Sequence, residues 1–590
     1  MTNREIALLL RKVAGSYIVK DEKKFHFQIR AYQKAADSIE NATIELKDLW
    51  DEGKLNSIPG IGASLTAHLD ELFKTGRVKH FEDIIKSLPK ALFILMGISG
   101  IGPKTAYKLA TILKLSEKNA VSDLEKAISQ HRVRIIEGFG EKSEEELLKS
   151  IDDYKKGQTK ENRMLLPLAN AIAQEVLIYL RQNKAVIRAD PLGSLRRMVT
   201  TVGDIDIAVA TENPKEVIEH FANYPHAKRV LGKGELASSR IILSSGRQVD
   251  LLVQSEKSYG ALLQHFTGSK FHNIALRELA LKKGLSLSEY GIKKDGKLIE
   301  YRTEEDFYRA VGLPWIPPEI REDTGEIEAA ANENLPNLVT IKDIKGDQQI
   351  HSDFPIEPSH DLGNSSMEEI LNMAKSLKYE YVGFSEHNPS VSKHTDKQII
   401  DLLKRRNEKV EKLRLNNKDV RIINLLEVDI IANGDLALKN DALKLLDGVI
   451  ASVHTGFDQS RSDMTNRIIN ALKNPYVRFL GHPTGRLLNQ REGYEADWDA
   501  IFSVCKEFDK ALEINAYPDR LDLPDFLVRK AVENNVKLII NTDSHDVSQM
   551  TLMSYGVAVA RRGWATKHDI VNTMGYNDFI KWIHIRKGVI

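Results

Sequence analysis

The sequence predicts a multidomain protein with an N-terminal helical region, a central α+β region and a C-terminal α/β region. A chain of 590 residues is too long for one hydrophobic core and should divide into several domains. Near the N-terminus, glycine-rich turns precede amphipathic helices. From about residue 343, short apolar strands that end in His, Asp or Glu alternate with amphipathic helices. That alternation is typical of an α/β barrel whose site lies at the carboxyl ends of its strands.

Composition and charge indicate the cellular compartment and the partners of the protein. The single cysteine, Cys505, excludes a disulfide framework and fits a reducing compartment, so we expect a cytoplasmic protein. The first residues lead into a charged amphipathic stretch unlike a signal peptide, and no apolar run is long enough to span a bilayer, so we expect no membrane partner. The net charge of +1 conceals a basic N-terminal half, which suits contact with a phosphate backbone.

Two turns in the N-terminal region resemble each other. The segments IPGIG at 58–62 and ISGIGPK at 98–104 each lead into an apolar-periodic helix, and EGFGEK at 137–142 is a weaker third copy. Glycines at such a turn expose backbone N–H groups that can bind DNA phosphate without reading bases. One copy alone is more often just a turn, but two favour paired helix-hairpin-helix modules. The candidate DNA-binding residues are Gly60, Gly62, Gly100, Gly102 and Lys104.

The most informative stretch is LGSLRR at 192–197 followed by GDID at 203–206. On a β-strand, Asp204 and Asp206 would project from the same face, too close for both to stay ionised without a cation. Carboxylates beside a phosphate-sized Gly-Ser turn suggest Mg²⁺ held partly by the protein and partly by substrate phosphates. Two solvated acids at a strand end are the simpler alternative, which the Gly-Ser turn and the arginine pair make less favourable.

A third acid and a second turn extend this pattern. Asp250 lies within the apolar run at 247–253, and HFTGSKFHN at 265–273 is followed by Arg277. Together these motifs resemble the nucleotidyltransferase palm of the family X DNA polymerases. The resemblance implies that Asp204, Asp206 and Asp250 hold two Mg²⁺ ions. It also implies a nucleotide-binding set of Gly193, Ser194, Arg197, Gly203, His265, Phe266, Gly268, Lys270, Asn273 and Arg277.

The same resemblance implies DNA-templated gap filling in base excision repair by a distributive monomer, with gapped or primer–template DNA and dNTPs as partners. His265 replaces the usual aromatic residue of the turn, which leaves sugar discrimination open, and MVT at 198–200 also departs from bacterial members. The lysine that forms a Schiff base in DNA polymerase beta corresponds to His68, and an imidazole cannot form one. We therefore expect no lyase activity by that route.

The C-terminal strand ends resemble a PHP phosphoesterase. A lone histidine at a strand end is more often a hydrogen-bonded core residue, but this series follows the family order. The resemblance implies a distorted (β/α)7 barrel with a trinuclear Mn²⁺ or Zn²⁺ site and a 3′–5′ exonuclease. Its expected ligands are His351, Asp361, His387, Glu427, His454, His482, Asp543 and His545.

This site departs from the family pattern in three places. Gln349 stands where a histidine is usual, and an amide oxygen is a poorer ligand for Mn²⁺ or Zn²⁺. The insertion at 354–360 displaces the next acid, which leaves Asp361 as first candidate and Asp353 as second. Glu386 replaces the usual aspartate before His387. The nuclease therefore either works with weakened metal affinity or has become structural.

The predicted domains are a small helical domain at 1–84, a duplex-binding subdomain at 85–158, the palm at 159–256, a nucleotide-binding subdomain at 257–318, a linker at 319–342 and the barrel at 343–590. Two other classes of function stay open. One is a phosphoesterase whose polymerase half only delivers DNA, and the other is a non-catalytic DNA-binding scaffold. Nucleotidyltransferases acting on tRNA or antibiotics share the Gly-Ser turn and paired acids, but the helical hairpins favour templated synthesis.

Overall fold

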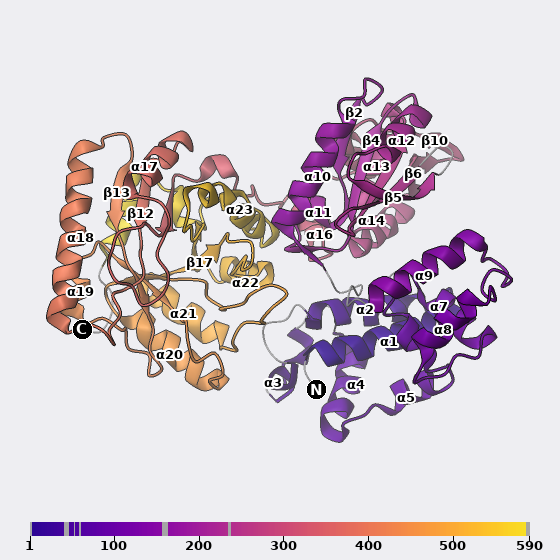
Figure 1. Ribbon diagram of the computed structural model, residues 1–590, viewed down its shortest axis with the longest axis horizontal. Helices are drawn as coiled ribbons and strands as arrows, with labels where there is room; N and C mark the ends of the chain where they lie inside the picture. Colours follow the sequence, from indigo (N-terminus) through magenta and orange to yellow (C-terminus); the bar gives the residue numbers. More distant parts are fainter. Residues whose placement is uncertain are drawn as a thin grey trace. The chain divides into compact units, whose positions relative to one another are not determined.

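The computed structural model describes residues 3–40, 46–51, 53–57, 61–98, 100–155, 163–233 and 238–585 (Figure 1). It divides into two compact units, Met1–Arg163 and Met164–Ile590. The first is helical, and the second contains several β-sheets with helices around them. Over the described ranges, no helix is both long and apolar enough to cross a membrane.

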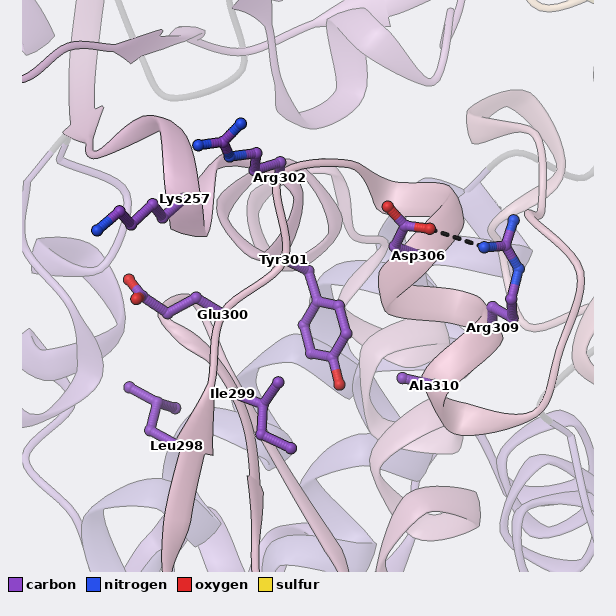
Figure 2. Close-up of a pocket in the computed structure, with 9 residues that line it drawn as sticks. All are labelled: Lys257, Leu298, Ile299, Glu300, Tyr301, Arg302, Asp306, Arg309 and Ala310. Atoms are coloured by element: carbon purple, nitrogen blue, oxygen red, sulfur yellow. Dashed lines mark hydrogen bonds and ion pairs between the residues drawn. The ribbon is translucent and has the colours of Figure 1, made fainter.

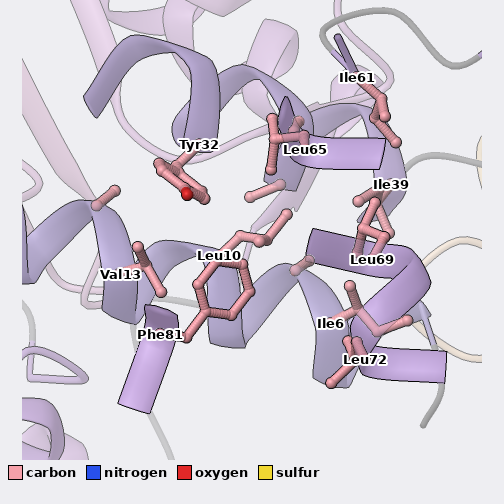
Figure 3. Packing of buried hydrophobic residues seen from close by; sticks show 14 of the residues in the cluster. Ile6, Leu10, Val13, Tyr32, Ile39, Ile61, Leu65, Leu69, Leu72 and Phe81 are labelled. Atoms are coloured by element: carbon pink, nitrogen blue, oxygen red, sulfur yellow. The ribbon is translucent and has the colours of Figure 1, made fainter. Parts of the chain in front are cut away.

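The first unit is built from amphipathic helices that bury their apolar faces against one another. Figure 3 shows Leu10, Tyr32, Leu65, Leu69 and Phe81 converging from four of these helices on one core. A second cluster of buried residues lies within 91–151. The helices are α1 (Asn3–Asp21), α2 (His26–Glu40), α3 (Leu46–Asp51), α4 (Ala63–Thr75), α5 (Lys79–Lys86), α6 (Ala91–Leu95), α7 (Pro103–Ile112), α8 (Ala120–Ser129) and α9 (Glu141–Lys155).

A five-stranded mixed sheet with the order β2-β4-β7-β6-β5 forms the first part of the second unit. Only β4 and β7 run parallel, and the other neighbouring pairs are antiparallel. The strands are β2 (Arg188–Pro191), β4 (Ile205–Ala210), β5 (Ala227–Lys233), β6 (Ser238–Leu243) and β7 (Gln248–Gln254). Accompanying elements are β1 (Met164–Leu165), β3 (Thr201–Val202), α10 (Leu166–Leu180), α11 (Gly193–Arg196) and α12 (Pro214–Ala222).

A smaller helical and hairpin region follows this sheet, with α13 (Tyr259–Thr267), α14 (Lys270–Lys282), β8 (Leu285–Ser288), β9 (Gly291–Lys294), β10 (Lys297–Ile299) and α15 (Glu304–Val311). The expected linker contains α16 (Glu326–Ala331). It is anchored to this region because buried Glu326 lies 2.6 Å from Nδ1 of buried His272. A pocket of about 880 Å³ lies in this region. Figure 2 shows its lining residues, among which Arg309 pairs with Asp306. Its lining includes none of the predicted site residues.

Parallel strands make up the rest of the second unit, in the order β11-β12-β13 and β14-β15-β16-β17-β18. Parallel bridges from His387 to Glu427 and from Ile350 to Ser544 connect the two sheets at both ends. The strands are β11 (Gly346–Ile350), β12 (Tyr381–Phe384), β13 (Arg421–Asn424), β14 (Glu427–Asp429), β15 (Val449–Ser452), β16 (Val477–Leu480), β17 (Ala511–Asn515) and β18 (Lys537–Asn541).

Helices connect these strands, and Figure 1 shows α18 running along the outer side of β12 and β13. They are α17 (Met367–Ser376), α18 (Asp396–Asn416), α19 (Asn440–Leu443), α20 (Arg461–Lys473), α21 (Trp498–Phe508), α22 (Asp525–Glu533), α23 (Met553–Arg562) and α24 (Tyr576–Ile583). Because parallel strands share the direction of their carboxyl ends, the residues that end them gather on one side.

The first unit's core gives a stability prediction. Leu69→Ala removes a fully buried side chain from α4 and should cost about 2–5 kcal/mol, since a cavity adds to the lost burial. Native-state hydrogen exchange on the full chain should show faster exchange in 63–85 and unchanged exchange in 346–541. Ile112→Ala, at a side chain 51% exposed, should change stability by no more than about 0.5 kcal/mol. Equal effects from both substitutions would contradict this view of the core.

Candidate functional site

Two of the three predicted palm acids are neighbours across the sheet. Asp206 on β4 pairs with Asp250 on β7 in parallel register, and Asp204 directly precedes β4. Gly193 begins α11 in a left-handed conformation (φ +59°), and a Cβ there would lie 2.9 Å from Oδ2 of Asp206. A glycine is therefore required for the Gly-Ser turn to approach this carboxylate.

The three acids repel one another. Burial raises the pKa of Asp206, and the charges of Asp204 and Asp250 raise it further, to about 7. Arg240 on β6 opposes this effect; it faces Asp250 across the sheet and donates to both of its carboxylate oxygens, at 2.7 and 2.6 Å. Because the ionised form of Asp206 is disfavoured in this way, the site is suited to a divalent cation, which would restore the ionised form. Arg240 is not identified by any sequence motif, because only the antiparallel pairing of β6 with β7 brings it opposite Asp250.

The arginine pair after the Gly-Ser turn makes two separate ionic contacts. Arg196 binds Glu304 in two hydrogen bonds of 2.9 and 2.6 Å, and Arg321 donates to the same carboxylate at 2.7 Å. Burial alone would raise the pKa of Glu304, but Arg321 and Arg196 outweigh it and lower that pKa to about 2. Arg197, the expected phosphate ligand, donates to Glu322 (3.0 Å) and to the Thr267 carbonyl.

The FTGS turn lies against this arginine. Gly268 has a left-handed backbone (φ +70°), and a Cβ there would lie 3.1 Å from Nη1 of Arg197. Asn273 on α14 donates to the His265 carbonyl at 2.6 Å, and Arg277 contacts the His265 ring at 3.2 Å. The structure therefore brings the turn, Arg197 and the first turns of α14 together. Of the remaining nucleotide-binding candidates, Ser194 lies within α11, Gly203 immediately precedes Asp204, Phe266 is half-buried and Lys270 is exposed.

In the first unit, the predicted glycines lie at helix starts. Gly62 and Gly102 are the N-terminal caps of α4 and α7, each with extended backbone, and Gly100 is left-handed (φ +83°). Lys104 is exposed and pairs with Glu22 at 2.8 Å. Gly60 lies outside the described residues. His68 is hydrogen-bonded to the Tyr32 hydroxyl (3.2 Å) and stacks on His80, with ring centroids 4.7 Å apart.

The carboxyl ends of the parallel strands β11–β18 converge on one cluster of histidines and carboxylates. Three groups each offer three ligand atoms within 4.8 Å of one another: His351, His387 and His545; His351, Glu427 and Asp543; and His387, Glu427 and His454. His482 joins through a 3.0 Å contact between its Nε2 and Glu427. Asp361 lies 3.3 Å from His387 and 3.4 Å from His545, whereas no ion pair of Asp353 is found among the described residues.

Several buried ligand atoms in this cluster have no hydrogen-bond partner among the described residues, including Nδ1 of His387 and Oε2 of Glu427, which lie 3.4 Å apart. Buried polar groups are rarely left unsatisfied, and a metal ion between such atoms would explain them. Gln349 is part of the same site: its Nε2 lies 3.3 Å from Asp543, and its buried Oε1 is also unsatisfied. The donor set therefore fits divalent metals, with an amide oxygen in place of one imidazole.

The structure adds two residues that the sequence analysis left out of the site. His360 and Asp429 form a further ligand group with His454, through contacts of 2.9 Å from His360 and 2.6 Å from His454 to the Asp429 carboxylate. His360 ends the insertion at 354–360, so its place beside β14 depends on the fold. Glu386 is in none of these ligand groups among the described residues, and its buried carboxylate pairs with buried Arg406.

Comparisons with known proteins show which families the chain resembles. Residues 262–322 match the family described as DNA polymerase beta thumb, residues 1–78 match the helix-hairpin-helix domain, and residues 93–153 match the SAM-like helix-hairpin-helix tandem. The chain is 33% identical to the DNA polymerase/3′–5′ exonuclease PolX of Bacillus subtilis (strain 168) over 582 residues, or 98% of both proteins. It is 24% identical to DNA polymerase lambda of Rattus norvegicus over 54% of this chain and 56% of that protein. It is also 29% identical to a probable phosphatase of Thermoanaerobacter sp. (strain X514) over 35% of this chain and 84% of that protein.

The Glu304 network gives a pH prediction. A carboxyl whose pKa falls from 4.5 to about 2 on folding stabilises the fold above pH 4.5 and loses that contribution as the pH falls through 2, roughly 3 kcal/mol in all. In urea unfolding between pH 5 and 2, Glu304→Gln should therefore show a weaker loss of stability with acid than the wild type. Glu305→Gln, at an exposed neighbour, should follow the wild type. Identical acid profiles for Glu304→Gln and wild type would contradict the assignment.

Proposed function

Since the chain belongs to the PolX type of family X DNA polymerases, we propose that it fills short gaps in duplex DNA by two-metal nucleotidyl transfer at Asp204, Asp206 and Asp250. The observation that carries this proposal is the parallel register of β4 and β7, which sets Asp206 against Asp250. A carboxylate pair with the pKa of one member near 7 calls for a divalent cation at neutral pH.

The three acids would hold the metals, and Arg240 orients the carboxylate of Asp250. When bound, Mg²⁺ supplies a lowered pKa for the primer 3′-hydroxyl and neutralises charge on the triphosphate and the pyrophosphate. Asp206, between two other carboxylates, releases its proton as the ions are taken up. Arg240 keeps both oxygens of Asp250 in a fixed orientation through its two hydrogen bonds.

The Gly-Ser turn and the FTGS turn would bind the incoming nucleotide. Ser194, the Gly203 backbone and Arg197 are the groups for the β- and γ-phosphates, with Arg197 offering a planar fork. Gly268 allows the second turn to approach Arg197 closely. Asn273 and Arg277 on α14 would face the nascent base pair, and His265, held by both side chains, would lie near the sugar.

DNA itself would be held by helix starts. Gly62 and Gly102 leave backbone N–H groups at the N-termini of α4 and α7 without side-chain caps, which suits phosphate contacts that are independent of sequence. Exposed Lys104 adds a positive charge at the second of these turns. This arrangement supports binding to the duplex on either side of a gap.

For the parallel-strand region we propose a PHP barrel with a metal-dependent 3′–5′ exonuclease. Its support is the convergence of the ligand groups and their unsatisfied buried atoms. A borderline cation such as Mn²⁺ or Zn²⁺ suits imidazole and carboxylate together, and such ions, when bound, supply an activated water for phosphodiester hydrolysis. The chain's own residues orient the ligands: Glu427 spans His351, His387, His454 and His482. Because Gln349 replaces an imidazole, we expect weaker metal binding than in a site with a complete histidine set.

The experiment that tests both activities uses a gapped duplex with a 5′-labelled primer and Mn²⁺, with and without dNTPs. Lengthening with dNTPs and shortening without them would establish a bifunctional enzyme. Lengthening alone would mean that the altered barrel site is structural. Shortening alone would favour a phosphoesterase to which the polymerase half delivers DNA. Neither activity, with DNA binding intact, would favour a scaffold.

A reciprocal pair of variants separates the two sites. Asp250→Ala removes a ligand of the palm and should reduce primer extension by about a thousand-fold or more, since metal-derived charge stabilisation is worth several kcal/mol. Shortening of the primer should stay at the wild-type rate, because Asp250 belongs to none of the barrel groups. Glu427→Ala should show the reverse pattern. Joint loss of both activities in a folded Asp250→Ala protein would refute independent sites.

His360 gives a prediction that needs no activity. His360→Ala should lower the affinity for Mn²⁺ or Zn²⁺ about 10- to 100-fold, the range found when a group that supports a metal site is removed. Titration calorimetry and elemental analysis after gel filtration measure this change. His394→Ala is the matched control, since His394 contacts Glu357 and Ser390 but lies in none of the ligand groups among the described residues. Equal metal binding by both variants would remove His360 from the site.

A further inference from the structure

A barrel arginine reaches the Gly-Ser turn of the palm. Arg562, the last residue of α23, donates through Nη1 to the Arg197 carbonyl at 2.9 Å and to the Glu322 carboxylate at 3.0 Å. Its Nε donates to Asp525 on α22 at 2.7 Å. The Arg562 side chain is 8% exposed, and those of its partners Glu322 and Asp525 are 26% and 30% exposed, so these ion pairs are partly shielded from water.

Glu322 is shared between two arginines. Its Oε1 accepts from Nε of Arg197 and from Nη1 of Arg562, each at 3.0 Å. Arg197 in turn donates to the Thr267 carbonyl, in the turn that begins the nucleotide-binding region. Charges therefore alternate along one path, from Asp525 through Arg562, Glu322 and Arg197 to the FTGS turn.

Because Glu322 is shared by two arginines, Arg562 influences how strongly Glu322 binds Arg197. With Arg562 present, Glu322 has a second cationic partner that stays in place when Arg197 turns toward an anion. Without Arg562, Arg197 is the only one of these two cations left to balance the charge of Glu322, whose side chain is 26% exposed. Their ion pair should then be tighter, since a partly buried carboxylate is costly to leave unpaired. Arg197 would then be held away from an incoming phosphate, and its backbone carbonyl would lose a donor.

We propose that Arg562 is a positioning residue for nucleotide binding, which keeps Glu322 from capturing Arg197 and thereby makes the barrel a part of the dNTP site. The inference rests on the proposed role of Arg197 as a triphosphate ligand. Arg562 itself contacts no substrate in this scheme. A lysine would not replace it, because one ammonium group cannot serve Asp525, Glu322 and the Arg197 carbonyl with the geometry of a guanidinium fork.

The test compares steady-state single-nucleotide insertion by the full chain on a gapped duplex, measuring KM for the dNTP and kcat. Arg562→Gln should raise KM about ten-fold with little change in kcat, the size expected when one charge-assisted hydrogen bond is lost from binding. The matched control is Arg561→Gln. Arg561 lies next to Arg562 and also joins α23 to the segment after the polymerase region, through Glu319 (2.7 Å) and the Val339 carbonyl (3.0 Å). It contacts neither Glu322 nor Arg197 among the described residues, and its KM should equal that of the wild type.

A second substitution distinguishes positioning from simple damage. In the Arg562→Gln background, Glu322→Gln removes the charge that captures Arg197, so KM should return toward the wild-type value. An unchanged KM in Arg562→Gln, equal effects from Arg561→Gln and Arg562→Gln, or no recovery in the double variant would each overturn the inference.

Arg197→Gln separates this inference from the function on which it rests. A raised KM in Arg197→Gln with an unchanged KM in Arg562→Gln would overturn only the role of Arg562. An unchanged KM in Arg197→Gln, or a wild type that inserts no nucleotide, would overturn the phosphate role of Arg197 and the positioning role together.

Discussion

The cost of charging Asp206 is the constraint on which the polymerase half depends, and it arises first from burial and then from the charges of Asp204 and Asp250. Two carboxylates placed in register on adjacent parallel strands cannot both be charged without a compensating cation. Arg240 balances the charge of Asp250 through two hydrogen bonds. The pKa of Asp206 nevertheless stays near 7. The glycine that begins α11 packs directly against Asp206, so the Gly-Ser turn that we propose for substrate binding and the acids that we propose as metal ligands are in direct contact.

The barrel half meets the same electrostatic problem with different chemistry. Its acids, Glu427 and Asp543, are buried mainly among imidazoles, and the guanidinium of Arg520 lies 3.8 Å from Asp543. A histidine can lose its proton and become a ligand at neutral pH, whereas an arginine cannot. Burial lowers the pKa of both His351 and His482, which favours the neutral form that binds a metal. These donor sets support our proposal of oxygen-seeking Mg²⁺ for the three aspartates and of a metal that accepts nitrogen for the histidine cluster.

Much of this could be predicted from the sequence because both sites use residues at strand ends, where a period of two and an apolar flank identify the strand. Asp204, Asp206 and the barrel histidines were found in that way. His360 could not be, since only the path of the 354–360 insertion brings it to Asp429. Arg562 could not be either, because its partners Glu322 and Arg197 lie 240 and 365 residues away. Long-range ion pairs carry no local pattern, and the sequence shows only an ordinary arginine at a helix end.

These long-range pairs change how the two halves relate to each other. Arg196, Glu304 and Arg321 bind the Gly-Ser turn to the region that follows the palm, and Arg197, Glu322 and Arg562 extend that contact to α23. Arg196 is thus held by buried Glu304 and Arg197 by partly buried Glu322, both from later in the chain, and neither arginine is a solvated side chain. Because breaking one member of an ionic network leaves the others uncompensated, the conformation of the Gly-Ser turn depends on Arg562 of α23, which lies 365 residues after Arg197 in the chain. If this turn binds nucleotide as we propose, the parallel-strand region contributes to the geometry of the nucleotide site independently of any metal that it binds itself.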